Sequence, residues 1–583
     1  MHYPWWYVPG LTSPMIIAVV AIFHVIVSHY AVGGGILLAR ENAFAIKKKE
    51  NNYRAYWKKH SQFFVLLTVV YGAITGVGIW WTIGLSSPLA TELLIRTFLF
   101  GWAIEWAFFV VEIVAAFAFY YYWDRLPGKD HARIGWIYAL AAWISLVLIT
   151  GITSFMLNSA SLLAPPGSDR LESFWKAFLN MQFIPQTIAR TGGALVLSTF
   201  YVYFHAAWSE KNDNVREKVV QRMRLPSLIG ILLMIAAIPL WYFWLPQSSK
   251  MMLESAAALN IFLVLFFAIC GAAMFLILIG PVRAPKKVST GFAIALLLFG
   301  FAAVSTGEFI REAIRKPFIV DQLVYGNQIQ TNEVEKIRKK GILASGYWTR
   351  IHMEKLQKKY PKLKIVESIT AESSPIVPGR ILPVQYSAPQ SGAAQFREIS
   401  NKDGVEPIPL GQNPVFKPAS TENGSGLVPA APPSLPKAAN PTAPEKEEKP
   451  ANKASSRGVL PIDNTIQQGN PSLLKISEED RIDLGKTIFL YHCNDCHSTK
   501  HGYAAVGPLL TGRTNEEIRN LVLNLNRPGF YMPPWCGNQV EAELLTQYLA
   551  SIRPEIPENI LGTDKLEKKK EDPAPKESNP GTP

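Results

Sequence analysis

Eight long apolar stretches in the first 310 residues limit what this chain can fold into. A helix needs about 20 predominantly apolar residues to span the hydrocarbon core of a bilayer, and each stretch reaches that length. Lipid offers no hydrogen bonds to the backbone, so spanning helices must satisfy their own. Residues 1–318 are therefore predicted to form a mainly α, polytopic membrane bundle, with helices at about 13–38, 62–84, 93–123, 135–157, 183–208, 226–245, 257–279 and 288–309.

The lysines and arginines between these stretches predict the orientation in the membrane. The loops after the first, third, fifth and seventh helices hold 18 of them, whereas the loops after the second, fourth and sixth hold only Arg170, Lys176 and Lys250. Basic loops stay in the cytoplasm, so the N-terminus and everything beyond residue 310 are expected on the periplasmic side of a bacterial inner membrane. The net charge of +13 then reflects orientation in a lipid bilayer, and no nucleic-acid partner is expected.

The composition changes after the last apolar stretch. The sequence "TNEVEKIRKKGILASGYW" favours short soluble helices in a periplasmic segment over residues 319–361, and the Pro, Ala and Ser of 362–475 indicate a flexible linker. A compact all-α domain is expected over 476–561, followed by a disordered tail over 562–583. A linker of about 110 residues reaches roughly 55–60 Å, far enough for the domain to swing. A permanently docked domain is the alternative.

The stretch "YHCNDCHSTK" carries the most specific motif in the chain. Two thiols and an imidazole at the spacing Cys493-x-x-Cys496-His497 usually hold one covalent haem c, with the histidine as an iron ligand. Met532, in "YMPPW", is the candidate for the other axial position, because a thioether favours ferrous iron. A zinc site is disfavoured because no second ligand pair follows at zinc spacing. With a helix on each side, the order resembles a class I cytochrome c over roughly 75 residues.

Ionisable groups inside the apolar stretches are costly and are candidates for function. His24 and His29 lie in "AIFHVIVSHYAVGGG", and Glu105 and Glu112 lie two turns apart on one face of the third helix. His24 and Glu105 are expected at a similar depth, as ligand and partner of a haem. The end of the eighth helix, "TGEFIREAIRKPF", adds Glu308, Glu312 and Arg315, suited to a haem ligand with a basic partner for a propionate. Hydrogen-bonded packing residues, a proton path without metal and ordinary interfacial charges are the alternatives, and His60 and His205 are interpreted as interfacial.

The first eight helices resemble the large haem-bearing subunit of cytochrome bd-type oxidases. The likeness rests on "FHVIVSH", on "AIEWAFFVVE" followed by "FYYYWDRL", and on "REAIRKPF", which is similar to the family's Glu-x-Gly-Arg-Gln-Pro-Trp motif. The resemblance implies two non-covalent membrane haems of the b or d type. It implies His24 as ligand of the active-site haem with Glu105 on its other side. It also implies Glu112 as a proton-relay carboxylate, Glu312 as ligand of the second haem, and Arg315 near that haem's propionate.

The sequence departs from that family at several places. Where the family uses a His and a Met for its low-spin haem, this chain offers Gln186 and roughly Phe267. The outer loop that helps to bind quinol is shortened to "LPQSSKMMLESAA", and a cytochrome c stands in place of a ninth helix. The chain therefore looks like a bd-type subunit whose quinol entrance has been replaced by an outer cytochrome.

Three functions remain in competition at this point. The first is a terminal oxidase-like enzyme that takes electrons from a periplasmic donor through haem c, passes them to the membrane haems and reduces oxygen. The second is an electron-transfer subunit without oxygen chemistry, which links a periplasmic redox enzyme to the membrane or to quinone within a larger complex. The third, a structural anchor for a cytochrome c, leaves the buried His and Glu residues unexplained. Other membrane subunits are expected as partners in the first two.

The charge distribution yields a test of the orientation. Because the basic residues are divided 18 to 3 between the two sets of loops, a reporter fused near residue 50 should behave as cytoplasmic and one fused after residue 340 as external. An alkaline phosphatase and green fluorescent protein pair at each position measures this. The opposite result would overturn the orientation and the haem placement together.

Overall fold

A computed structural model describes residues 6, 8, 10–159, 170–365, 466–502, 504–526 and 532–555, with no side chains described for 170–173. All of these residues belong to one compact unit formed by Met1–Ala388 and Pro461–Pro583. The expected tail over 562–583 and most of the expected linker over 362–475 lie outside the described residues.

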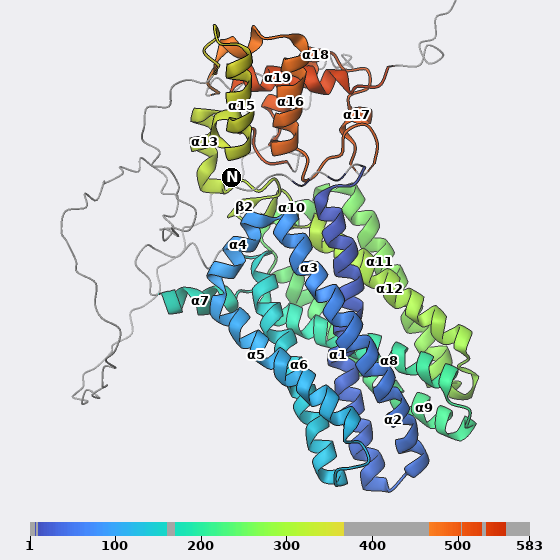
Figure 1. Cartoon of the computed structure of the whole chain (residues 1–583). Helices are drawn as coiled ribbons and strands as arrows, with labels where there is room; N and C mark the ends of the chain where they lie inside the picture. Colours follow the sequence, from blue (N-terminus) through green and yellow to red (C-terminus); the bar gives the residue numbers. More distant parts are fainter. Residues whose placement is uncertain are drawn as a thin grey trace, which may run out of the picture. The chain divides into compact units, whose positions relative to one another are not determined.

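Long helices make up the membrane part, as Figure 1 shows. Several begin earlier or end later than the apolar stretches, because charged turns extend them beyond the hydrocarbon region. Asn51–Ser86 is one continuous rod in which a π-helical turn, η1, joins α2 to α3. The long helices are α1 (Ser13–Lys48), α2 (Asn51–Val65), η1 (Leu66–Tyr71), α3 (Gly72–Ser86), α5 (Leu99–Tyr121), α6 (Gly128–Phe155), α8 (Phe183–Ser209), α9 (Asp213–Phe243), α11 (Ala257–Ile277) and α12 (Thr290–Ala313).

The short elements between them cap the bundle or continue its helices. Helix α11 runs on into a second π turn, and a 3-10 turn precedes α12. They are α4 (Pro88–Thr97), α7 (Arg170–Phe178), α10 (Gln247–Ser255), η3 (Leu278–Val282) and η4 (Pro285–Lys287).

The predicted class, a mainly helical membrane bundle, is confirmed, but the number of clearly apolar spans is not eight. Within the described part of the chain, 7 helices are long and apolar enough to cross a membrane, and α8 is not among them. Helix α8 has 27 residues, enough for about 40 Å. It carries Gln186, Arg190 and several hydroxyl side chains, and it packs against α1, α6, α9 and α12. Because protein surrounds it on several sides, α8 tolerates more polar residues than a lipid-facing helix.

Three consecutive glycines allow α1 to lie at the centre of the bundle. A Cβ atom on Gly33 would lie 2.2 Å from the carbonyl oxygen of Ala194 in α8, and one on Gly35 would lie 2.2 Å from the ring of Tyr138 in α6. A Cβ on Gly34 would lie 2.8 Å from the ring of Phe64 in α2. Small residues let membrane helices approach closely where no hydrophobic force drives them together. The glycine run therefore fixes three neighbours around one turn of α1.

The chain after α12 forms a small extramembrane part. It begins with an antiparallel pair of strands, β1 (Phe318–Val320) and β2 (Val324–Tyr325). The remaining elements come from two distant parts of the sequence, 331–359 and 471–551. They are η5 (Thr331–Glu333), α13 (Val334–Lys340), α14 (Ile342–Ser345), α15 (Tyr347–Lys359), η6 (Pro471–Leu474), α16 (Glu478–His492), α17 (Val506–Leu509), α18 (Asn515–Leu523) and α19 (Gln539–Ser551).

One hydrophobic core joins these two parts. It contains Ile337, Leu343 and Leu356 from the first part together with Leu484 and Leu544 from the second, all of them buried. The lack of a side chain on Gly485 lets α16 and α19 approach closely. A Cβ atom at this position would lie 2.2 Å from the carbonyl oxygen of Leu544. The structure therefore gives the segment after β2 and the C-terminal helices a single core.

A buried carboxylate fastens the two parts of this core. Glu541 on α19 is 2% exposed and accepts hydrogen bonds from the backbone N–H groups of Ile342 at 2.9 Å and Leu343 at 2.8 Å. Burial raises the pKa of the Glu541 carboxyl, while these N–H groups and that of Asn538 favour its charged form. Removing the carboxylate would leave buried donors without partners, each at a cost of about 1–3 kcal/mol.

The two ends of the undescribed stretch 366–465 also meet in this core. Ile365 and Ile466 are both buried in it, and the Asn470 side chain donates to the Ile365 carbonyl oxygen at 3.1 Å. The domain is thus built from chain on both sides of residues 366–465, and Ile365 and Ile466 belong to the same core. The C-terminal helices are attached to α12 through the segment beginning at β1.

This arrangement predicts what happens when the expected linker is cut. A specific protease site inserted between Gly424 and Ser425 should allow cleavage without release, because the shared core holds the C-terminal fragment to the membrane part. The measurement is the amount of C-terminally tagged fragment that stays with washed membranes after complete cleavage. A fragment that washes off quantitatively would contradict the shared core.

Glu541→Ala should weaken retention in the cleaved protein, whereas Glu543→Ala should not. Glu543 lies on the same helix, but its side chain is 38% exposed and pairs only loosely with Arg519 at 3.6 Å. Exposed ion pairs contribute about 0–1 kcal/mol.

Candidate functional site

The Cys-x-x-Cys-His motif follows directly after α16. Cys493 caps that helix, and the chain then turns back so that the N–H of His497 donates to the Cys493 carbonyl oxygen at 3.0 Å. The turn brings both thiols and the imidazole to one partly exposed place. In the part of the chain that the structure describes, the cysteines form no disulfide with one another.

The imidazole of His497 is already oriented for metal binding. Its Nδ1–H donates to the Ala504 carbonyl oxygen at 2.9 Å, so Nε2 is the nitrogen that could bind iron. Burial lowers the pKa of His497, although the Ala504 carbonyl opposes this, and the neutral imidazole is the form that binds metals. Met532 is partly buried and follows a stretch outside the described residues. The two thiols and the oriented imidazole fit the attachment of a c-type haem, and the second axial ligand Met532 stays a prediction from the sequence.

The motif lies against the chain that leaves α12. The ammonium of Lys316 donates to the Cys496 sulfur at 3.5 Å, and a Cβ on Gly326 would lie 3.4 Å from the same sulfur. The Asn327 side chain donates to the His492 carbonyl oxygen at 3.4 Å. Three contacts therefore hold the end of α16 beside residues 316–327.

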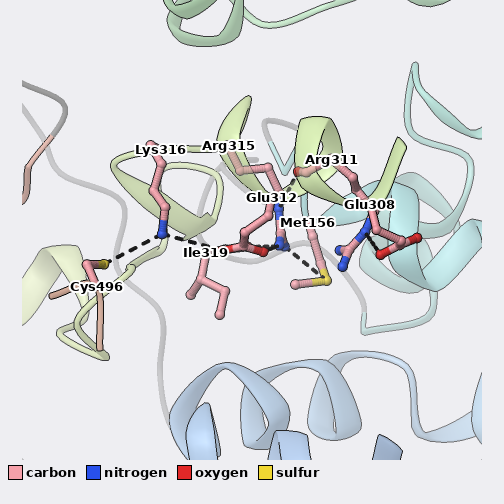
Figure 2. Close-up of polar contacts among 8 residues, drawn as sticks. All are labelled: Met156, Glu308, Arg311, Glu312, Arg315, Lys316, Ile319 and Cys496. Carbon is pink, nitrogen blue, oxygen red and sulfur yellow. Dashed lines mark hydrogen bonds and ion pairs between the residues drawn. The ribbon is translucent and has the colours of Figure 1, made fainter. Parts of the chain in front are cut away.

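A row of alternating charges ends α12 at this place, as Figure 2 shows. Arg311 pairs with Glu308 at 2.8 Å, and Glu312 pairs with Arg315 and also with Lys316 at 3.4 Å. The guanidinium of Arg315 is buried and donates to the Ile319 carbonyl oxygen at 2.9 Å. Glu312 thus lies between two cations, of which Lys316 also reaches Cys496.

The two carboxylates of α5 both face α6. Glu105 accepts a hydrogen bond from Ser145 at 2.9 Å, and Glu112 accepts one from Tyr138 at 3.1 Å. The two carboxylates are seven residues apart on α5, and their partners Tyr138 and Ser145 are seven residues apart on α6. This matching spacing confirms that the carboxylates share one face of α5. Tyr138 also donates to the Ala31 carbonyl oxygen of α1 at 3.2 Å, so it connects Glu112 to the central helix.

A small cavity lies beside Glu112. Its lining combines Glu112 and Tyr138 with apolar side chains and two residues of the π turn η1: Thr68, Val69, Ala73, Phe109, Glu112, Ile113 and Tyr138. π turns widen a helix locally and are frequent at functional sites. A carboxylate and a phenol in a narrow cavity can hold a water molecule and pass a proton.

His24 faces a different helix from Glu105. Its Nδ1 lies 3.1 Å from the hydroxyl of Thr75 on α3, and a Cβ on Gly76 would lie 3.3 Å from its ring. An imidazole oriented by a hydroxyl on one nitrogen fits an iron ligand through the other. Glu105 instead bonds to Ser145 on α6. The expected pairing of His24 with Glu105 is therefore not a direct contact between the two side chains.

The places of the missing low-spin haem ligands carry no replacement. Gln186 is partly buried near the start of α8, and Phe267 is 45% exposed on α11. A phenyl ring cannot bind iron, and an exposed one faces away from the bundle.

Two features of the site were not expected from the sequence. Lys316 follows Arg315 in the "REAIRKPF" stretch, but only the fold brings it to Cys496. The mutual contact of His60 and His205 is the second feature, because they are 0% and 4% exposed and their rings lie 4.8 Å apart. Tyr30 bonds to His60 at 3.1 Å. The helical spacing of each histidine gave no sign that α2 and α8 meet there.

The long apolar helices with carboxylates and histidine inside them define an integral membrane protein. Residues 13–255 match the family described as cytochrome bd terminal oxidase subunit I, a match that runs from α1 to α10 and covers less than half of the chain. Helix α12, which contains Glu312, and Arg315 just after it lie beyond the matched residues.

Among solved structures, bd oxidase from Geobacillus thermodenitrificans is similar, with 16% identity and a TM-score of 0.46 over 54% of this chain and 88% of that chain. No curated protein matches the chain.

The placement of His24 and Glu312 on different helices predicts separate effects on haem content. His24→Ala and Glu312→Ala should each remove a different non-covalent haem signal, because each side chain is expected to bind its own iron. Pyridine haemochrome spectra and reduced-minus-oxidised spectra of the purified variants measure this. Glu92→Ala, in an exposed pair with Arg96 on α4, is the control. Full haem content in both variants would contradict the ligand assignment.

Proposed function

We propose that this protein is a respiratory oxidoreductase of the bd-like type that takes electrons through an outer c-type haem, passes them to haems in the membrane bundle and reduces oxygen. The observation that carries the proposal is the contact of Cys496 with Lys316, four residues after Glu312. The place where haem c would be attached therefore adjoins the expected ligand of a membrane haem.

The residues for each haem follow from their chemistry. Cys493 and Cys496 would form the thioether bonds of haem c, and His497 and Met532 would be its axial ligands. His24 would bind the active-site haem with Glu105 on its other side, and Glu312 would bind the second haem with Arg315 near a propionate. These haems supply one-electron redox chemistry and a place where oxygen can bind.

Protons for oxygen reduction would pass Glu112. Its carboxylate lines the cavity at η1 and bonds to Tyr138, so a proton can move between a carboxyl group, a phenol and a water molecule over hydrogen-bond distances. Glu105, two turns away on the same face of α5, would be the next acceptor toward the active-site haem. The chain's own contribution is to hold the proton donor at a fixed place beside the central helix.

A docked cytochrome fits the contacts better than a swinging one. The domain shares its core with the segment that begins a few residues after α12, so the effective tether is much shorter than the expected linker. Electron transfer across a fixed contact needs no diffusion of the domain. The donor would be a periplasmic cytochrome or redox enzyme, and the cytochrome domain would face the periplasm of a bacterial inner membrane, with further membrane subunits as partners.

The second candidate is a relay without oxygen chemistry inside a larger complex. Gln186 and Phe267, at the places of the low-spin haem ligands, favour it because they imply that the haem set differs from that of the family. The dithionite-reduced spectrum with and without carbon monoxide separates the two functions. A membrane haem that binds carbon monoxide supports the oxidase, and membrane haems with both axial positions filled support the relay.

The order of reduction tests the proposed route. When the oxidised protein is mixed rapidly with a reduced periplasmic cytochrome, the c haem should be reduced before the membrane haems, because electrons enter at the outer domain. A reduced short-chain quinol should react little. Stopped-flow absorbance at the c and b bands measures both reactions.

The double variant Cys493→Ala with Cys496→Ala is the control. It should lose covalent haem staining and fast reduction while it keeps the non-covalent haems. Fast reduction of the membrane haems by quinol, with the c haem still oxidised, would contradict the route and make the cytochrome an exit for electrons.

A further inference from the structure

Lys316 lies between two groups that the proposed function assigns to different haems. Its ammonium is 3.5 Å from the Cys496 sulfur and 3.4 Å from a carboxylate oxygen of Glu312. The side chain is only 24% exposed, and a Cβ on Gly326 would lie 3.6 Å from its nitrogen. The fold therefore holds this cation in place from two sides.

The surroundings show that this is more than an ion pair at the end of a helix. Glu312 already has a partner in the buried Arg315, so Lys316 is not needed to neutralise it. An ordinary terminal lysine would extend into solvent, where its charge is well hydrated. Here the side chain instead turns toward the cytochrome motif, which follows in the sequence 180 residues later.

A fixed ammonium at this place acts on the redox equilibrium of a nearby haem. On reduction, ferric iron takes up one electron and the haem loses one positive charge. A neighbouring cation repels the ferric form more than the ferrous form, and a partly buried site weakens solvent screening. After attachment, the Cys496 sulfur is bonded directly to the haem periphery, so a group 3.5 Å from that sulfur lies at the edge of the ring.

We propose that Lys316 is a positioning residue that raises the reduction potential of haem c and holds its Cys496 edge beside Glu312. The inference rests on the proposed function, because it requires a haem at Cys493 and Cys496. It adds that the contact between the outer cytochrome and the membrane bundle tunes the entry of electrons. The other charges near Cys496 are Asp495, Glu312 and Arg315, and none of them contacts its sulfur among the described residues.

The test is the midpoint potential of the c haem in the full-length purified protein, measured by potentiometric titration at the c band. Lys316→Gln should shift the reduction equilibrium toward the oxidised form by about tenfold, which corresponds to about 59 mV for a one-electron couple. Lys316→Arg should stay close to the native value because it keeps the charge. Lys336→Gln, which removes an exposed lysine of α13, should leave the potential unchanged.

A potential in Lys316→Gln equal to that of Lys336→Gln would overturn the inference. If Lys316→Gln fails to take up covalent haem, the uptake of covalent haem is compared in Lys316→Met and Lys316→Arg. Uptake in the arginine variant alone supports a required cation, whereas loss in all three overturns it. Absence of covalent haem from the native protein would instead refute the proposed function, so the two failures are distinguishable.

Discussion

The close approach of α1 to its neighbours at Gly33, Gly34 and Gly35 is the constraint on which the membrane part depends. Each missing Cβ makes room for a different helix, and the space at Gly35 is filled by the ring of Tyr138. That ring is also the hydrogen-bond partner of Glu112 and of the Ala31 carbonyl. A side chain on Gly35 would therefore push α6 away and separate the phenol from the carboxylate. Packing and the expected proton path share one contact.

Where the chain leaves α12, paired charges take the part that close packing plays in the membrane bundle. Glu312, Arg315 and Lys316 lie within four residues of one another at the end of α12, and their pairs continue toward Cys496. Isolated charges at such depth would be expensive, but a paired row compensates each member. The buried Glu541 does the same for the N–H groups that open α14. Both devices fix the C-terminal helices relative to the chain that leaves the membrane.

The sequence was informative wherever local patterns decide structure. Apolar length predicted the membrane helices, and the seven-residue spacing of Glu105 and Glu112 predicted their common face. The same patterns failed where distant segments meet. Helix α8 is too polar for a hydropathy criterion because protein covers it, and the His60–His205 contact joins two helices about 145 residues apart. Lys316 and Cys496 could not be paired from spacing, and the long stretch 366–465 concealed that the chain on both sides of it forms one core.

Because this core is discontinuous, the Cys-x-x-Cys-His motif is held close to the membrane bundle and not on a long tether. A domain on a long flexible tether would reach the membrane surface by diffusion, at a rate set by its effective concentration there. Each electron transfer would then wait for such an encounter. A domain that shares its core with residues 329–365 has a fixed position instead, because only residues 314–328 lie between the end of α12 and that core. On the proposed route, the rate of electron entry would then depend on the distance and the potentials across one contact. The ammonium of Lys316 reaches the Cys496 sulfur across this contact, so on the proposed route the charge of one residue would bear on both the position and the energy of the step.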